Sequence, residues 1–192
     1  MSHFSVLVIG NNPEKDLLKY KETNSTDMNF PNEYLQSVDI TEECLSYDTL
    51  EEALDDYQLR YKIVEDESEI DLLEDHKYGY ALIKNGQLIK VIHRTNPDYK
   101  WDYYLLGGMF SGCLPLKNGK LANQARLHEV DLQKIDITYA VVKEGKWLAM
   151  GRMGWFGCSD NDKDDEQWSK EYHNLLKNLP DNTLLSVYDC HI

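Results

Sequence analysis

The stretch Tyr78–His93 reads YGYALIKNGQLIKVIH, and it decides the fold class. Two runs rich in apolar and β-branched residues flank Asn85-Gly86, the strongest short signal for a β-hairpin. A second pair of such runs, 137–143 and 146–152, flanks Glu144-Gly145. Strands that cluster in hairpins and do not alternate with helices favour a mostly antiparallel sheet.

Two further strands are expected far apart in the sequence, at Phe4–Ile9 and Thr183–Cys190. Both are strongly apolar, so either strand could lie centrally in a sheet, and the two could pair with each other. Helical patterns are expected at 13–22, within 41–75, and after the acidic run 160–166. We therefore predict an α+β fold, a mostly antiparallel sheet with helices packed on it.

The chain has 192 residues, of which 42% are hydrophobic and 28% charged, as is usual for a globular protein. This length fits one domain, or one domain with an insertion, and we expect a single α+β domain over 1–192 with an acidic helical segment at about 41–75. The first ten residues do not resemble a signal peptide, and no apolar run approaches the roughly 20 residues of a membrane span. We expect a cytoplasmic protein; its oligomeric state is left open.

Metal-binding patterns are missing from the sequence. The four cysteines form no Cys-x-x-Cys pair, and the six histidines form no His-Glu-x-x-His pattern. In a reducing compartment these cysteines are expected to be buried small hydrophobes. We expect neither a metal ion nor a cofactor.

The net charge of −14 is concentrated in one segment. Between Glu42 and Asp75 there are fourteen acidic residues against Arg60 and Lys62, which amounts to −12. A protein of this charge is not expected to bind nucleic acid directly. The segment could instead attract a basic protein or imitate a phosphate backbone, or it could be a solvated face that keeps the protein soluble.

Within that segment, apolar residues recur at helical spacing after Asp48, from Leu50 to Tyr61. The pattern predicts an amphipathic helix whose exposed face is acidic. The residues expected on that face, and so the candidates for binding a partner, are Glu51, Glu52, Asp55 and Asp56.

Aromatic residues and glycines alternate between Trp101 and Gly112 and again between Gly151 and Gly157. Glycine allows a backbone to approach a ligand closely, and aromatic rings offer a surface on which a base can stack. The alternative is that the glycines mark strand irregularities and the rings belong to the core. The candidate ligand-binding residues are Trp101, Asp102, Tyr104, Gly107, Gly108, Gln124 and Trp155.

Asp189-Cys190-His191 places an acid, a thiol and an imidazole in sequence. In a strand, Asp189 and His191 share one face and Cys190 the other, so the first two are the candidates for acid–base catalysis. His3 and His191 lie at the outer ends of the two apolar strands, and we expect them to be far apart whichever way those strands pair.

Four stretches resemble a family of small proteins from tailed bacteriophages and prophages. They are MSHFSVLVIG (1–10), WDYYLLGG (101–108), MGWFG (153–157) and LLSVYDCHI (184–192). Members of that family are similar in opening with Ser-His-Phe, in carrying Trp-Asp-Trp-Tyr…Gly-Gly-Arg-Trp, and in closing on an Asp-Cys-His-like strand. The acidic region from Glu42 to Asp75 lies outside the resemblance.

This chain has Met109 where the family pattern has Arg after Gly-Gly. If that Arg binds phosphate in relatives, the contact is lost here. The resemblance supplies context and no settled activity. It implies an accessory protein of phage type that counters host defence by binding without catalysis, for example by sequestering a nucleotide-derived immune signal. The alternatives are a protein inhibitor or DNA mimic that uses the acidic helix to bind a host defence protein, and a hydrolase that acts on nucleotides.

Overall fold

The computed structural model describes residues 2–23, 27, 29–154 and 158–192. The chain folds into two compact units. The first unit comprises Met1–Lys21 and Lys100–Ile192, and the inserted unit comprises Glu22–Tyr99. Each unit pairs its own strands, mostly antiparallel, so the predicted α+β class is confirmed.

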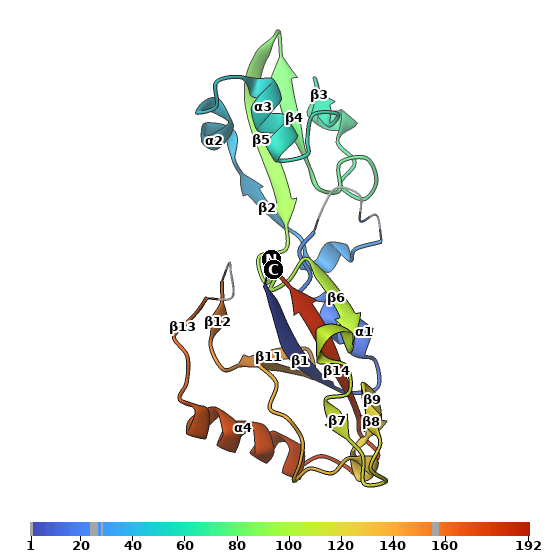
Figure 1. Ribbon diagram of the computed structural model, residues 1–192. Helices are drawn as coiled ribbons and strands as arrows, with labels where there is room; N and C mark the ends of the chain where they lie inside the picture. The colour runs from blue at the N-terminus through green and yellow to red at the C-terminus, as the bar shows by residue number, and fades with distance from the viewer. Residues whose placement is uncertain (1, 24–26, 28, 155–157) are drawn as a thin grey trace. The chain divides into compact units, whose positions relative to one another are not determined.

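The central sheet of the first unit has the strand order β11-β10-β1-β14-β6, and β9 also pairs with β14 (Figure 1). These strands are β1 (His3–Ile9), β6 (Tyr103–Leu106), β9 (Gln124–Arg126), β10 (Ala140–Lys143), β11 (Lys146–Ala149) and β14 (Leu184–His191). β1 and β14 are antiparallel along their whole length and lie inside the sheet, as their apolar sequences indicated. β1 is parallel to β10, whose hairpin with β11 confirms the second predicted hairpin.

Short elements complete the first unit. They are α1 (Pro13–Leu18), η3 (Gly108–Phe110), β7 (Leu114–Pro115), β8 (Leu121–Ala122), η4 (Leu127–Glu129), β12 (Arg152–Met153), β13 (Ser159–Asp160) and α4 (Asp165–Lys177). α1 ends at Leu18, earlier than the expected Glu22. Among the helices of the described residues, none is long and apolar enough to cross a membrane.

Each face of the sheet carries its own hydrophobic core, because alternate residues of a strand point to opposite sides. On one face, Leu7 and Ile9 pack with the α4 residues Trp168, Tyr172 and Leu176. On the other face, the core contains Val6, Val8, Trp101 and Tyr188 together with Leu17 of α1. The two helices α1 and α4 therefore cover opposite faces of the sheet, and α4 is the helix expected after the acidic run 160–166.

The inserted unit is a four-stranded sheet with the order β2-β5-β4-β3, covered by two short helices. Its elements are η1 (Asn32–Tyr34), β2 (Gln36–Asp39), α2 (Thr41–Leu45), α3 (Leu50–Asp56), β3 (Ile63–Val64), η2 (Glu67–Glu69), β4 (Gly79–Lys84) and β5 (Gln87–Thr95). The hairpin of β4 and β5 turns at Asn85 and Gly86, with φ of +51° and +75°, as the Asn-Gly pair predicted.

The acidic helix is shorter than its sequence pattern indicated. α3 begins after Thr49, whose hydroxyl accepts the backbone N–H of Glu52 at 3.2 Å. It ends at Asp56, so Tyr61 lies beyond the helix and its side chain is 88% exposed. The chain leaves the helix at Gln58, whose φ of +57° is left-handed, and the residue that resumes packing in the core is Leu59, not Tyr61.

We predict that Asp164→Ala destabilises the first unit through α4. The Asp164 carboxylate caps this helix by accepting the Gln167 backbone N–H at 2.7 Å. Loss of an N-cap lowers the free energy of unfolding by about 1 kcal/mol, measurable by urea denaturation. Asp164→Asn keeps a capping oxygen and should remain close to the parent protein; equal losses in the two variants would contradict the capping role.

Candidate functional site

The pairing of β1 with β14 brings four polar side chains together at one end of the sheet. His3 lies directly opposite His191 in the register, so the expectation that these residues lie far apart is wrong. In an antiparallel pair, the first residue of one strand meets the last residue of the other. Asp189 lies two residues before His191 and on the same face of β14. With Asp102, which precedes β6, these residues form the histidine–carboxylate cluster.

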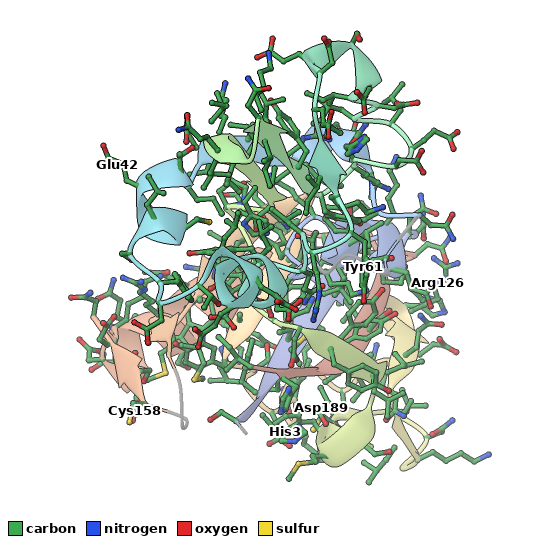
Figure 2. The ribbon with its side chains drawn as sticks, turned by 90° about the horizontal axis from the view of Figure 1, so that it is seen from above. His3, Glu42, Tyr61, Arg126, Cys158 and Asp189 are labelled. Atoms are coloured by element: carbon green, nitrogen blue, oxygen red, sulfur yellow. The ribbon has the colours of Figure 1, made fainter. Side chains whose placement is uncertain are left out.

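His3 and Asp189 form the first pair of the cluster (Figure 2). The Nδ1 atom of His3 is 2.9 Å from Oδ1 of Asp189. The other carboxylate oxygen, Oδ2, accepts the backbone N–H of Met109 at 2.9 Å. The Asp189 side chain is 8% exposed and that of His3 is 37% exposed. A buried, anchored carboxylate therefore orients an imidazole that remains accessible.

His191 and Asp102 form the second pair, with 2.6 Å between Nδ1 and Oδ1. Here the imidazole is the more buried partner, because the His191 side chain is 14% exposed and that of Asp102 is 46% exposed. The rings of His3 and His191 meet edge to face, with centroids 5.1 Å apart. The Nε2 atom of His191 is buried and has no hydrogen-bond partner among the described residues.

Gly107 and Gly108 make this packing possible. Both have positive φ, +75° and +51°. A Cβ at Gly108 would lie 2.5 Å from the Asp189 side chain, and one at Gly107 would lie 2.2 Å from Asn123. The Asn123 Oδ1 atom in turn accepts the backbone N–H of Gly112 at 2.7 Å. The two glycines thus let the backbone approach the protein's own side chains.

The residues predicted to stack on a ligand occupy other places. Trp101 is fully buried, and its ring packs against Phe4, Tyr20 and Trp147 with centroids 5.5–6.4 Å apart. Its faces are covered, so the structure supports the alternative that this ring belongs to the core. Tyr104 packs edge-on against Tyr188.

The other predicted site residues are scattered. Gln124 donates a hydrogen bond to the Ser186 hydroxyl at 2.9 Å. Trp155 lies outside the described residues. The four acidic residues proposed for partner binding, Glu51, Glu52, Asp55 and Asp56, are exposed on α3 as predicted, although Arg60 pairs with both Glu51 and Asp55.

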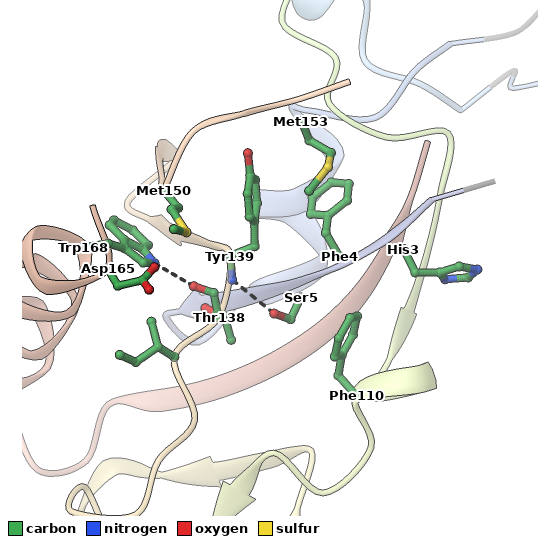
Figure 3. A pocket seen from close by; sticks show the side chains of 11 residues that line it. His3, Phe4, Ser5, Phe110, Thr138, Tyr139, Met150, Met153, Asp165 and Trp168 are labelled. Atoms are coloured by element: carbon green, nitrogen blue, oxygen red, sulfur yellow. Dashed lines mark hydrogen bonds between the residues drawn. The ribbon is translucent and has the colours of Figure 1, made fainter. Parts of the chain in front are cut away.

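Beside His3 lies a cleft of about 440 Å³ that the sequence did not reveal (Figure 3). We call it the aromatic cleft, because its lining is dominated by aromatic and methionine side chains: Phe4, Phe110, Tyr139, Met150, Met153 and Trp168. His3 lies at its edge, and its imidazole points away from the aromatic side chains of the cleft (Figure 3). These residues come from five separate segments, so no local motif could have joined them.

Hydroxyl groups of Ser5, Thr138 and Tyr139 also line the cleft. The hydroxyl of Ser5 accepts the Tyr139 backbone N–H at 3.1 Å, and among the described residues it makes no hydrogen bond with His3. Burial raises the pKa of Tyr139 to about 12, so this phenol stays protonated at neutral pH. Within the described parts of the chain, no group of His, Cys, Asp and Glu is arranged to hold a metal ion. Besides Tyr139, the titratable side chains that line the cleft are those of His3 and Asp165.

Cys190 takes no part in the cluster. It points to the opposite face of β14 from Asp189 and His191, as strand alternation predicted, and it is fully buried. Burial, with the Asp189 charge as a smaller cause, raises the pKa of its thiol well above the ordinary value. A neutral, buried thiol is a poor nucleophile.

Comparison with known proteins adds no relative: no family model, curated protein or solved structure matches this chain.

We predict that Gly108→Ala disturbs the cluster through Asp189. A non-glycine residue in this left-handed conformation costs about 1–2 kcal/mol, and the added methyl group would also displace the carboxylate. Urea denaturation measures the loss of stability. Gly119→Ala is the matched control, because Gly119 has φ +84° and no atom near its Cβ position. Equal losses in the two variants would show that Gly108 matters only for its backbone.

Proposed function

We propose that this protein is a hydrolase that acts on a nucleotide-like ligand by general acid–base catalysis, with His3 as the base. One observation carries the proposal. The buried Asp189 carboxylate, fixed by the Met109 N–H, holds His3 Nδ1 at 2.9 Å while the ring lies at the edge of the aromatic cleft. Asp189, a catalytic candidate from the sequence, thereby pairs with His3, which was not among the candidates.

The hydrogen bond defines what His3 can do chemically. A carboxylate at Nδ1 selects the tautomer with a proton on that atom, which leaves the Nε2 lone pair to accept a proton from water or from a substrate hydroxyl. The same carboxylate stabilises the imidazolium that results. A positioned base of this kind accelerates a reaction by about 10²–10⁴-fold.

The aromatic cleft supports the choice of ligand class. Its volume of about 440 Å³ lies within the range of small-molecule sites. Phe110 and Tyr139, which are partly exposed, supply aromatic surface for a planar base, whereas the rings of Phe4 and Trp168 are buried in the core beneath. Binding in this cleft would bring a bond of the ligand to the edge at which His3 lies. Sequestration of a nucleotide-derived signal would use the same cleft without turnover.

We predict that His3→Gln and Asp189→Asn each lower turnover of a nucleotide substrate by about 10²-fold or more. The assay incubates purified protein with cyclic nucleotides and ADP-ribose derivatives and separates the products by chromatography. His128→Gln, which changes an exposed histidine in η4, is the control and should leave turnover unchanged.

The results separate catalysis from sequestration. Turnover that survives both substitutions would overturn the role of His3 and Asp189. Binding of a ligand by titration calorimetry, without turnover by the parent protein, would favour sequestration.

A second function is favoured by the distribution of charge between the two units. By sequence, the inserted unit carries −13 and the first unit −1. We propose that the inserted unit binds a basic surface of a partner protein, as a charge or DNA mimic would. A host defence protein that binds DNA is the class of partner that this charge fits.

We predict that reversing four charges on α3, at Glu51, Glu52, Asp55 and Asp56, abolishes capture of such a partner in salt-dependent pulldown. The reversed side chains would be positive and would repel the basic surface of the partner, which would slow association and weaken the complex. The matched control reverses four exposed acids elsewhere in the same unit, Glu65, Glu67, Glu69 and Glu74. Unchanged capture by the α3 variant would rule out this helix, and equal loss in both variants would point to net charge alone.

A further inference from the structure

The strand β11 lies at one end of the central sheet, and one of its edges is open (Figure 1). The Met150 N–H, just after β11, donates to the Tyr139 carbonyl at 2.9 Å. Because hydrogen-bonded pairs alternate along an antiparallel ladder, the backbone groups of Leu148 face β10 and those of Trp147 and Ala149 point away from it. In the described parts of the chain, the backbone groups of Trp147 and Ala149 have no hydrogen-bond partner. This edge can therefore pair with a further strand.

Two lysines lie directly opposite each other where β10 turns into β11. Lys143 faces Lys146 in the register, so both side chains project on the same side of the sheet, and like charges at such positions repel. A single exposed lysine on an edge strand would discourage pairing, but Lys143 is half-buried and comes from the inner strand. Among the described residues, neither lysine forms an ion pair, and Glu171, which shares a cavity with Lys143, is paired with Lys163. The two lysines are therefore suited to bind a carboxylate of another molecule.

A cavity of about 350 Å³ lies between this hairpin and α4, and Lys143 is part of its lining. Its apolar lining comes from Leu148 of β11 and from Leu175 and Trp168 of α4. Trp168 is buried, whereas the two leucines pack on the core with part of their surface left exposed. Leu148 lies two residues from Lys146 and therefore on the same side of the sheet. The edge of β11 thus presents a positive and an apolar position, two residues apart, on the side that α4 covers.

We propose that β11 and α4 form a docking site for an extended segment of a partner protein that carries an acidic residue two positions from an apolar one. A segment paired with β11 places two such residues opposite Lys146 and Leu148, on the α4 side. The carboxylate then meets the lysines, and the apolar side chain enters the cavity. Main-chain hydrogen bonds to Trp147 and Ala149 supply affinity, and the two side chains supply specificity. This site lies in the first unit, whose charge is close to neutral, and it requires neither of the functions proposed above.

The first test measures peptide binding to the full chain by fluorescence anisotropy. The labelled probes are Thr-Glu-Thr-Leu-Thr-Val and its reverse, because a strand can add in either direction, and the same peptides with Lys in place of Glu. We expect the parent protein to bind one acidic probe at least about tenfold more tightly than its basic counterpart, and Lys143→Glu/Lys146→Glu to reverse this preference. Lys120→Glu/Lys134→Glu, at two exposed lysines of the same unit, is the matched control and should keep the parent preference. Failure of the parent protein to bind either acidic probe, or an unreversed preference, would overturn the proposal.

The second test concerns the pairing of strands. Ala149→Pro removes an outward N–H and keeps the bonds to β10, so it should weaken binding of the acidic probe at least about tenfold, whereas Ala149→Val keeps the N–H and should bind like the parent protein. In the parent protein, saturation with the probe should slow hydrogen exchange of the Trp147 and Ala149 amides, followed by NMR. Exchange that the probe leaves unchanged would overturn strand addition, whether or not the proline variant folds. If both amides are protected without peptide and gel filtration shows a dimer, a second copy occupies the edge and the proposal fails.

Discussion

The antiparallel pairing of β1 with β14 is the constraint on which the first unit depends. Its register places His3 against His191 and joins the two sides of the sheet, because alternate residues of both strands enter opposite cores. A shift of one residue would turn Leu7 and Val187 toward the wrong core and would move Asp189 away from His3. Core packing therefore fixes the geometry of the histidine–carboxylate cluster, and the cluster need not stabilise itself.

Local sequence patterns predicted local structure well. Asn85-Gly86 and Glu144-Gly145 marked real hairpins, and the helix expected after the acidic run 160–166 is α4. Periodicity overestimated α3, because Tyr61 falls at helical spacing but lies beyond the end of the helix at Asp56 and is exposed. The pairing of the two apolar strands was also foreseeable from their composition. The hairpin and helix signals each lie within a few residues of one another, which is why the sequence alone predicts them.

The site was predicted only in part, because its geometry depends on long-range contacts. Asp189, His191 and Asp102 were named from the sequence, but nothing in their own segments indicates that Asp102 pairs with His191. His3 was missed because it was expected to lie far from His191. In an antiparallel pair, the first residue of β1 lies opposite the last residue of β14, and this rule would have placed His3 in the cluster. Gly107 and Gly108 drew attention as ligand contacts, whereas their closest neighbours are Asn123 and Asp189. A glycine in the sequence indicates that another group packs closely against the backbone there. It does not indicate whether that group belongs to a ligand or to another side chain of the protein.

The separation of His3 and Asp189 by 186 residues has a consequence for the order of assembly. The inserted unit is complete once Tyr99 has been synthesised, and its main hairpin is local, so it can fold while the chain is still growing. β14 is made much later, and until it emerges β1 lacks its antiparallel neighbour. The histidine–carboxylate cluster therefore cannot form until β14 has been synthesised, whereas the inserted unit can fold before then.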